Sequence, residues 1–124
     1  NNKIEKDKIL DVITSEPKQF QYVLHSIIHL SEQRNKDSSQ NDRHGPIFTG
    51  DVYNYYKDCV KNKLEVLTQR RVSDIIQEFD MLGIINVRVI SKGRGGRMRE
   101  IKLAISNEVT EKAKEIIRES LQFF

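Results

Sequence analysis

The sequence has 124 residues, of which 37% are hydrophobic and 31% are charged, and its formal net charge is +3. This length and composition predict one globular domain with its own hydrophobic core, and they exclude a disordered or fibrous chain. No apolar run approaches the roughly 20 residues of a membrane-spanning helix, so we expect no membrane partner. The single cysteine, Cys59, cannot form an internal disulfide, which favours an intracellular protein.

The first part of the chain predicts two helices separated by a Ser-Glu-Pro segment. Residues 3–14 carry a short apolar stripe, formed by Ile9, Val12 and Ile13. Residues 18–33 carry a stronger stripe, because their apolar residues recur at the spacing of one helical face. These residues are Phe20, Val23, Leu24, Ile27 and Ile28.

Two histidines of the second predicted helix, His25 and His29, are four residues apart. This spacing can hold a metal ion, but a site of this kind needs at least one further ligand, and the pattern supplies none. We therefore expect two ordinary helix histidines and no bound metal.

A polar stretch, residues 34–46, contains no large apolar residue and predicts a loop. Residues 47–49 predict a short strand, after which Thr49-Gly50-Asp51 opens a third helix. Its inward face is formed by Val52, Tyr56, Cys59 and Val60. Tyr53 and Tyr55 lie off this stripe, so we expect their hydroxyl groups to be available to a phosphate or a neighbouring domain. Residues 62–66 form the turn that follows.

The central helix is predicted for residues 69–82. Thr68 can cap its start, and Gly83 can end it in a left-handed conformation. The apolar residues share one face of this helix: Val72, Ile75, Ile76, Phe79 and Leu82. The opposite and flanking positions are polar and point to solvent.

A β-hairpin follows the central helix. Residues 84–91 and 98–105 alternate between apolar and polar positions, as two strands do, and residues 92–97 (KGRGGR) form the turn between them. Residues 92–102 contain five basic residues and one acidic residue, a local charge of +4. This concentration of positive charge is typical of a surface that meets phosphate groups.

The last predicted helix covers residues 108–121 and has Asn107 as its cap. The complete order is helix, helix, short strand, helix, helix, strand, strand, helix. A helix-turn-helix followed by a basic hairpin is the order of a winged helix, in which the hairpin is the wing. We therefore predict an α+β winged helix-turn-helix with additional terminal helices, forming one domain over residues 1–124.

In this fold the second helix of the motif enters the major groove of DNA, which is about as wide as a helix. Arg70 can bind a guanine edge through two parallel hydrogen bonds, and Gln77 can pair similarly with adenine. Ser73 lies beside them, and Arg71 on the flank suits a phosphate. The alternative for both arginines is an ion pair with Asp74 within the helix. Three acidic residues of this helix count against base contact: Asp74, Glu78 and Asp80.

The wing supplies the second set of expected DNA contacts. Glycines at three of the turn positions permit positive φ angles and a close approach of the backbone to a groove. Arg94 and Arg97 at the tip fit a narrow minor groove and its phosphates. Lys92 and Arg99 flank them on the two sides of the turn. The alternative is a hairpin whose arginines serve only solubility.

Nothing in the sequence predicts catalysis. The glycine-rich turn joins two strands and lacks the Gly-Lys-Ser/Thr ending of a nucleotide-binding P-loop. No cysteine–histidine set or pair of carboxylates stands out as a reaction centre. We therefore expect a binding domain without a catalytic residue or a cofactor of its own.

Two segments make the chain similar to a known family. LTQRRVSDIIQEFDMLGII (residues 67–85) and SKGRGGRMREIKL (residues 91–103) resemble the carboxy-terminal winged-helix domain of the archaeal replication initiators. These initiators are relatives of the largest subunit of the origin recognition complex and of the helicase-loading cell-division-cycle protein. Residues 17–30 also resemble the first helix of that domain. The resemblance implies sequence-specific binding of double-stranded origin DNA, with contacts by Gln69, Arg70, Arg71, Ser73, Arg94 and Arg97.

The resemblance also implies a larger parent protein. The chain starts with Asn1 rather than Met, so we expect a fragment whose parent carries an AAA+ ATPase module that binds ATP and magnesium. Other initiator copies or the replicative helicase are further expected partners, and the isolated domain is expected to be a monomer. We expect a cytoplasmic, chromosome-associated protein. Two other functions remain open: a winged-helix transcription regulator, and a protein–protein docking module of the replication machinery.

Overall fold

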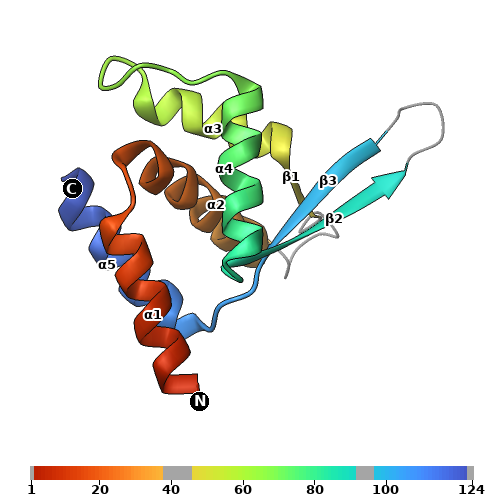
Figure 1. The fold of residues 1–124 in the computed structure, drawn as a ribbon. Helices are drawn as coiled ribbons and strands as arrows, with labels where there is room; N and C mark the ends of the chain where they lie inside the picture. Colours follow the sequence, from red (N-terminus) through yellow and green to blue (C-terminus); the bar gives the residue numbers. More distant parts are fainter. Residues whose placement is uncertain (1, 38–45, 92–96, 123–124) are drawn as a thin grey trace.

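The computed structural model describes residues 2–37, 46–91 and 97–122 (Figure 1). Its elements follow the predicted order: α1 (Asn2–Ser15), α2 (Lys18–Asp37), β1 (Ile47–Phe48), α3 (Thr49–Val60), α4 (Gln69–Met81), β2 (Ile85–Ser91), β3 (Arg97–Leu103) and α5 (Asn107–Leu121). The α+β winged-helix prediction is therefore confirmed.

The predicted polar loop starts later than expected, because α2 continues to Asp37. Arg34 consequently belongs to this helix, and its guanidinium group lies 3.7 Å from the carboxylate of Asp51 in α3. Most of the predicted loop, residues 38–45, lies outside the described residues.

The three strands form an antiparallel sheet in the order β1-β3-β2. Ile101 lies at its centre, opposite Ile47 on one side and Val87 on the other. β3 ends at Leu103 rather than at Ile105, and Ser106 then caps the start of the last helix. The inner end of the sheet is buried, whereas the outer end of the β2–β3 hairpin projects beyond the helices (Figure 1).

Helix α2 is the centre of the hydrophobic core. It packs against α3, α4, α5, β1 and β3, and its inward residues Val23, Leu24 and Ile27 are almost completely buried. Phe79 of α4 is buried beside it, with its ring edge-to-face to Phe20 at a centroid distance of 6.0 Å. This packing holds α4 against the core by its apolar stripe and leaves the opposite face in solvent.

Both ends of α4 are formed as the sequence predicted. The Thr68 side chain accepts a hydrogen bond from the backbone N–H of Arg71 at 3.2 Å. At the other end Gly83 has a φ of +82°, and the N–H of Ile84 donates to the carbonyl of Phe79 at 3.0 Å. This is the Schellman arrangement, in which a left-handed glycine turns the chain out of the helix. The turn directs the chain immediately into β2.

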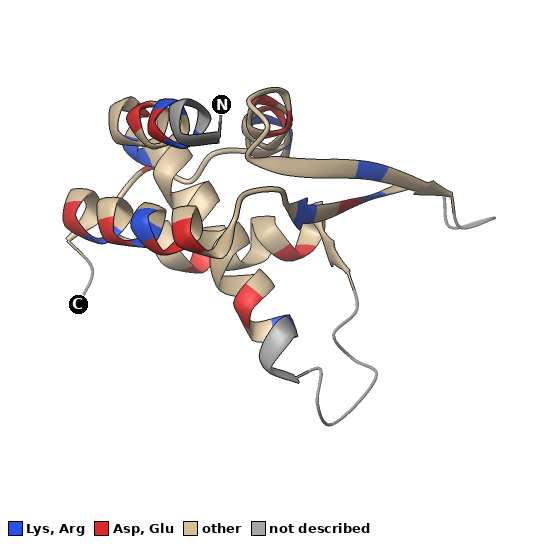
Figure 2. Cartoon of the chain, turned by 90° about the horizontal axis from the view of Figure 1, so that it is seen from below, with Lys and Arg blue, Asp and Glu red and all other residues tan. Residues whose placement is uncertain are grey.

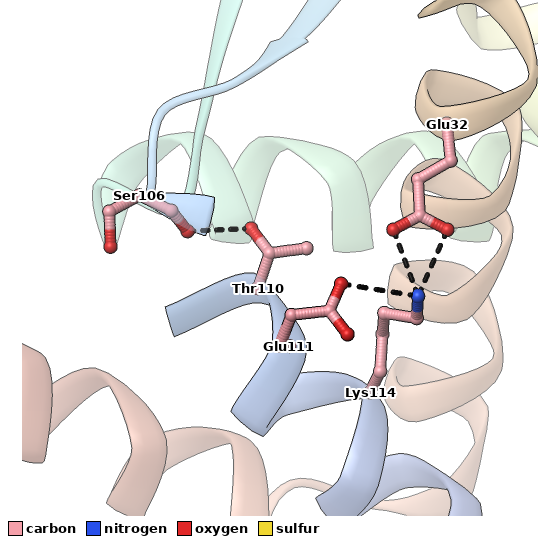
Figure 3. Close-up of polar contacts among 5 residues, drawn as sticks. All are labelled: Glu32, Ser106, Thr110, Glu111 and Lys114. Carbon is pink, nitrogen blue, oxygen red and sulfur yellow. Dashed lines mark hydrogen bonds and ion pairs between the residues drawn. The ribbon is translucent and has the colours of Figure 1, made fainter. Parts of the chain in front are cut away.

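Helices α1 and α5 pack against each other at the side of the domain away from the hairpin (Figure 1). The predicted cap of α5 was wrong, because Ser106 rather than Asn107 accepts the hydrogen bond, from the N–H of Val109 at 3.2 Å. Ser106 has extended backbone angles, as a cap requires, and Asn107 is already helical. Figure 3 shows that α5 is also joined to α2, because the Lys114 ammonium lies 3.0 Å from the Glu32 carboxylate.

The two α2 histidines take part in side-chain packing. The His29 ring stacks on Tyr55 of α3 at a centroid distance of 4.4 Å, and the His25 ring lies 6.0 Å from the same tyrosine. Within the described ranges, no group of three or more His, Cys, Asp or Glu side chains could hold a metal ion. Cys59 is partly buried on the neighbouring surface of α3. None of the described helices is both long and apolar enough to cross a membrane.

Candidate nucleic-acid interface

The outward face of α4 carries the residues of this helix that are predicted to contact DNA. Gln69, Arg70, Arg71 and Gln77 are exposed, whereas Ser73 is half-buried. Arg70 and Arg71 form no ion pair with any residue that the structure describes. The pairing with Asp74 that the sequence allowed is therefore not formed, and both guanidinium groups are accessible to a ligand.

The structure describes only part of the predicted wing. Lys92 and Arg94 lie outside the described residues, and Arg97 is the first residue of β3, opposite Ser91. Arg99 is exposed and lies opposite Val89, whose side chain is also largely exposed at 55%. Residues two apart on a strand, and residues paired across an antiparallel sheet, point to the same face. Arg99 and Val89 therefore lie on the face of the sheet that, nearer the core, carries Ile101 and Val87.

The opposite face of the hairpin carries a basic residue that the sequence analysis did not select. Arg88 of β2 has a side chain that is 76% exposed, and its Nε lies 3.7 Å from the carboxylate of Glu100. The signal was present in the alternation of β2, since Arg88 stands between two apolar residues and must point to the other face. Basic residues consequently occur on both strands of the projecting hairpin (Figure 2).

The turn before α4 is held by three side chains, Gln19, Tyr53 and Tyr56, which we call the Leu67 clamp. The Tyr53 hydroxyl donates to the carbonyl of Leu67 at 2.9 Å, and the N–H of Leu67 donates to the Tyr56 hydroxyl at 3.1 Å. Tyr56 in turn donates to Oε1 of Gln19 at 2.5 Å. The expectation that the Tyr53 hydroxyl is available to a phosphate or another domain is therefore wrong, because this hydroxyl binds the backbone before α4.

Among the described residues, the two groups with the largest pKa shifts, His25 and Tyr55, lie away from α4 and the hairpin. Burial, and to a smaller extent the nearby His29, lower the pKa of His25 from 6.5 to about 4. Burial and the neighbouring Cys59 raise the pKa of Tyr55 to about 12. These shifts come from the contact between α2 and α3, where the rings pack together, and they do not mark a reaction centre at the outward face of α4.

A core-packed helix with an accessible arginine face, followed directly by a projecting hairpin, defines a winged-helix domain. The family described as CDC6, C terminal winged helix domain, matches residues 11–113. The chain belongs to this family, as the resemblance of its central segments indicated.

The curated relatives that match this chain are ORC1-type DNA replication proteins. ORC1-type DNA replication protein 7 of Halobacterium salinarum is 45% identical over 111 residues, which cover 89% of this chain and 20% of the relative. The ORC1-type DNA replication protein of Pyrococcus furiosus is 47% identical over 106 residues, covering 85% of this chain and 23% of the relative. The chain thus spans about a fifth of the length of these relatives.

One solved structure is similar in both sequence and fold. It is the Aeropyrum pernix ORC1 protein in complex with DNA, which matches with a TM-score of 0.74 and 36% sequence identity. The match covers 97% of this chain and 28% of that protein.

Proposed function

We propose that this chain is the DNA-binding domain of an archaeal replication initiator and recognises double-stranded DNA at replication origins. The observation that carries the proposal is the outward face of α4, where Arg70 and Arg71 are accessible beside a projecting basic hairpin. The Aeropyrum pernix relative, which has this fold, was solved in complex with DNA.

In the proposed complex α4 lies in the major groove. Arg70 donates two hydrogen bonds to a guanine edge, and Gln77 pairs with adenine. Gln69, Arg71 and Ser73 contact the sugar–phosphate backbone next to them and set the register of the helix on the duplex. Ser73 is half-buried, so its contact requires a close approach of α4 to the backbone.

The wing lies against the minor groove and its phosphates. Lys92, Arg94, Arg97 and Arg99 supply the positive charge, and their contacts are independent of base sequence. Arg88 adds a further cation on the opposite face of the hairpin. Each phosphate that these residues neutralise releases counterions, which makes the affinity fall as the salt concentration rises.

The domain contributes binding rather than catalysis to the larger protein. We infer that the intact initiator has an AAA+ ATPase module outside this chain, which binds ATP and magnesium. Other initiator copies and the replicative helicase are its proposed protein partners, whereas the isolated domain is a monomer. A domain separated from such a module loses the effective concentration that linkage provides, so its affinity is lower than that of the intact protein.

The test is fluorescence anisotropy with two labelled duplexes, one selected by this domain from a randomised pool and one scrambled version of it. The wild type is titrated at several salt concentrations beside Arg70→Ala and the double variant Arg94→Ala/Arg97→Ala. Lys112→Ala is the matched control, because it removes one exposed positive charge from α5.

We expect Arg70→Ala to lose roughly 1–3 kcal/mol of discrimination between the two duplexes. The wing variant should bind both duplexes more weakly and reduce the slope of log affinity against log salt by about 1 per lost phosphate contact. Lys112→Ala should change neither quantity. Absence of binding to any duplex at low salt would refute DNA binding by the domain alone.

A second candidate function, docking to another protein, is favoured by one feature at the C-terminal end of α4. Met81 is 75% exposed and Leu82 is 37% exposed, and they border a groove that Ile9 and Val12 of α1 also line. Exposed apolar surface of this kind is common at protein interfaces. If the titration detects no DNA binding, docking becomes the better explanation of this domain.

A further inference from the structure

The Leu67 clamp forms hydrogen bonds to three backbone groups of residues 65–67. Both polar groups of the Leu67 main chain are hydrogen-bonded to tyrosine hydroxyls, the carbonyl to Tyr53 and the N–H to Tyr56. Two residues earlier, Nε2 of Gln19 donates to the carbonyl of Glu65 at 2.6 Å. The end of the turn is therefore tied to α2 and α3 by side chains.

The clamp combines one fully buried side chain with two half-buried ones, Tyr53 and Gln19. Tyr56 is completely buried, and Gln19 lies in the first turn of α2, far from Leu67 in sequence. The two tyrosine rings lie together at a centroid distance of 6.2 Å. Hydroxyl groups carried by packed rings have little freedom to move, so the positions of the Leu67 carbonyl and N–H follow those of α2 and α3.

The clamped residue is next to the start of α4. Thr68, the cap, follows Leu67 directly, and Gln69, Arg70 and Arg71 are the first three helical residues. The Thr68 carbonyl accepts from the N–H of Val72 at 3.0 Å, which continues the hydrogen-bonded path from Leu67 into the helix. A shift of Leu67 would therefore move the residues proposed to read and position the DNA.

We propose that Gln19, Tyr53 and Tyr56 are positioning residues for base recognition, which hold the N-terminal end of α4 in the orientation that the bases require. The proposal rests on the proposed function, because it concerns how the same face of α4 discriminates between duplexes. Two parallel hydrogen bonds from an arginine to guanine tolerate only small displacements, whereas a phosphate contact tolerates larger ones. Loosening the clamp should therefore reduce specificity and spare non-specific binding.

The test removes the hydroxyl groups and keeps the rings, in Tyr53→Phe, Tyr56→Phe and the double variant. The matched control is Ser120→Ala, which removes a side chain–side chain hydrogen bond of 2.5 Å between α5 and Gln21 of α2. Each protein is measured in three ways: its thermal midpoint, the exchange rate of the Leu67 amide hydrogen, and its affinities for the selected and scrambled duplexes.

We expect Tyr56→Phe to exchange the Leu67 amide at least about 10-fold faster, because the amide loses its acceptor. In the double variant the affinity ratio of selected to scrambled duplex should fall roughly 10-fold, while affinity for the scrambled duplex stays within about 2-fold. Ser120→Ala should alter the thermal midpoint without altering this ratio.

An unchanged ratio in the double variant, with the wild type discriminating normally, would overturn the positioning role and leave the proposed function standing. An equal loss of the ratio in Ser120→Ala would also overturn it, because general destabilisation would then explain the effect. If the wild type binds neither duplex, the proposed function fails and this proposal fails with it.

Discussion

The carboxylate of Glu100 lies 3.7 Å from the Nε of Arg88, across the two strands of the hairpin. The two residues are directly paired in the sheet, and Glu100 is only 8% exposed although it is charged. Positions 92–102 contain five basic residues, and Glu100 is the one acidic residue in this segment. Glu100 therefore reduces the positive charge that the hairpin presents. It also restrains Arg88, whose side chain is largely exposed.

This pair leads to a prediction about non-specific DNA binding. Glu100→Gln should raise the affinity for a scrambled duplex about 2- to 5-fold at low salt and steepen the salt dependence by up to about 1, because one more cation becomes available to phosphates. Anisotropy titrations at several salt concentrations measure both quantities. Glu119→Gln on α5 makes the same charge change far from the hairpin, and an equal increase there would contradict the explanation.

The glycine that ends α4 should be sensitive to substitution for a conformational reason alone. Gly83→Ala places a side chain on a residue with φ of +82°, although no atom lies within 4 Å of the new Cβ. We expect the free energy of unfolding to decrease by roughly 1–2 kcal/mol in urea denaturation.

Gly50 provides the matched control for this change. It lies in the first turn of α3, its Cβ would also meet no atom within 4 Å, and it has no positive φ. Gly50→Ala should therefore raise the free energy of unfolding by roughly 0.5–1 kcal/mol. Equal effects of the two substitutions would show that the left-handed conformation is not what matters at Gly83.

The contact between Glu32 and Lys114 should contribute modestly to stability (Figure 3). It joins α2 to α5, and both side chains are about one-third exposed, so solvent screens the attraction. Glu32→Gln should lower the free energy of unfolding by about 0.5–1 kcal/mol, with a smaller effect at high salt.

Glu111 offers the comparison, because it pairs with the same lysine within α5, at 3.3 Å. A pair three residues apart on one helix contributes only about 0.2–0.5 kcal/mol, so Glu111→Gln should have the weaker effect. A larger loss for Glu111→Gln than for Glu32→Gln would contradict the role assigned to the link between helices.

Stability should depend on pH through His25, whose pKa is lowered from 6.5 to about 4, chiefly by burial. Between these values the unfolded chain binds the proton and the folded chain does not, so acid favours unfolding. The His25 contribution is fully present above pH 6.5 and is lost as the pH falls towards 4. We expect it to be roughly 1–3 kcal/mol, since the partial exposure of the ring reduces the full effect of about 1.4 kcal/mol per pKa unit.

Urea denaturation at intervals between pH 7 and pH 4 measures this dependence. His25→Gln should flatten the curve in that range, because the titrating group is gone. His29→Gln should retain most of the slope, since it removes only the smaller cause of the pKa shift. A curve for His25→Gln that stays parallel to the wild type would show that other groups produce the acid sensitivity.

The sequence by itself determined the order of helices and strands, the two ends of α4 and the outward face of this helix. Thr68 and Gly83 end α4 by local backbone chemistry, and the hydrophobic spacing of α4 identifies its outward face without reference to another element. The alternation in β2 and β3 places the basic residues on a hairpin for the same reason, because the period of a strand is local.

Other features depended on the tertiary structure. Two residues next to each other, Ser106 and Asn107, can both cap a helix, and only the path of the chain out of β3 decides between them. The burial of Glu100 depends on the neighbours that the folded sheet provides. The hydroxyl groups of Tyr53 and Tyr56 form hydrogen bonds with the backbone of Leu67, which is 14 and 11 residues away in the sequence. Periodicity reports which side of an element faces the core, whereas a hydrogen-bond partner on another element is set by how the elements pack.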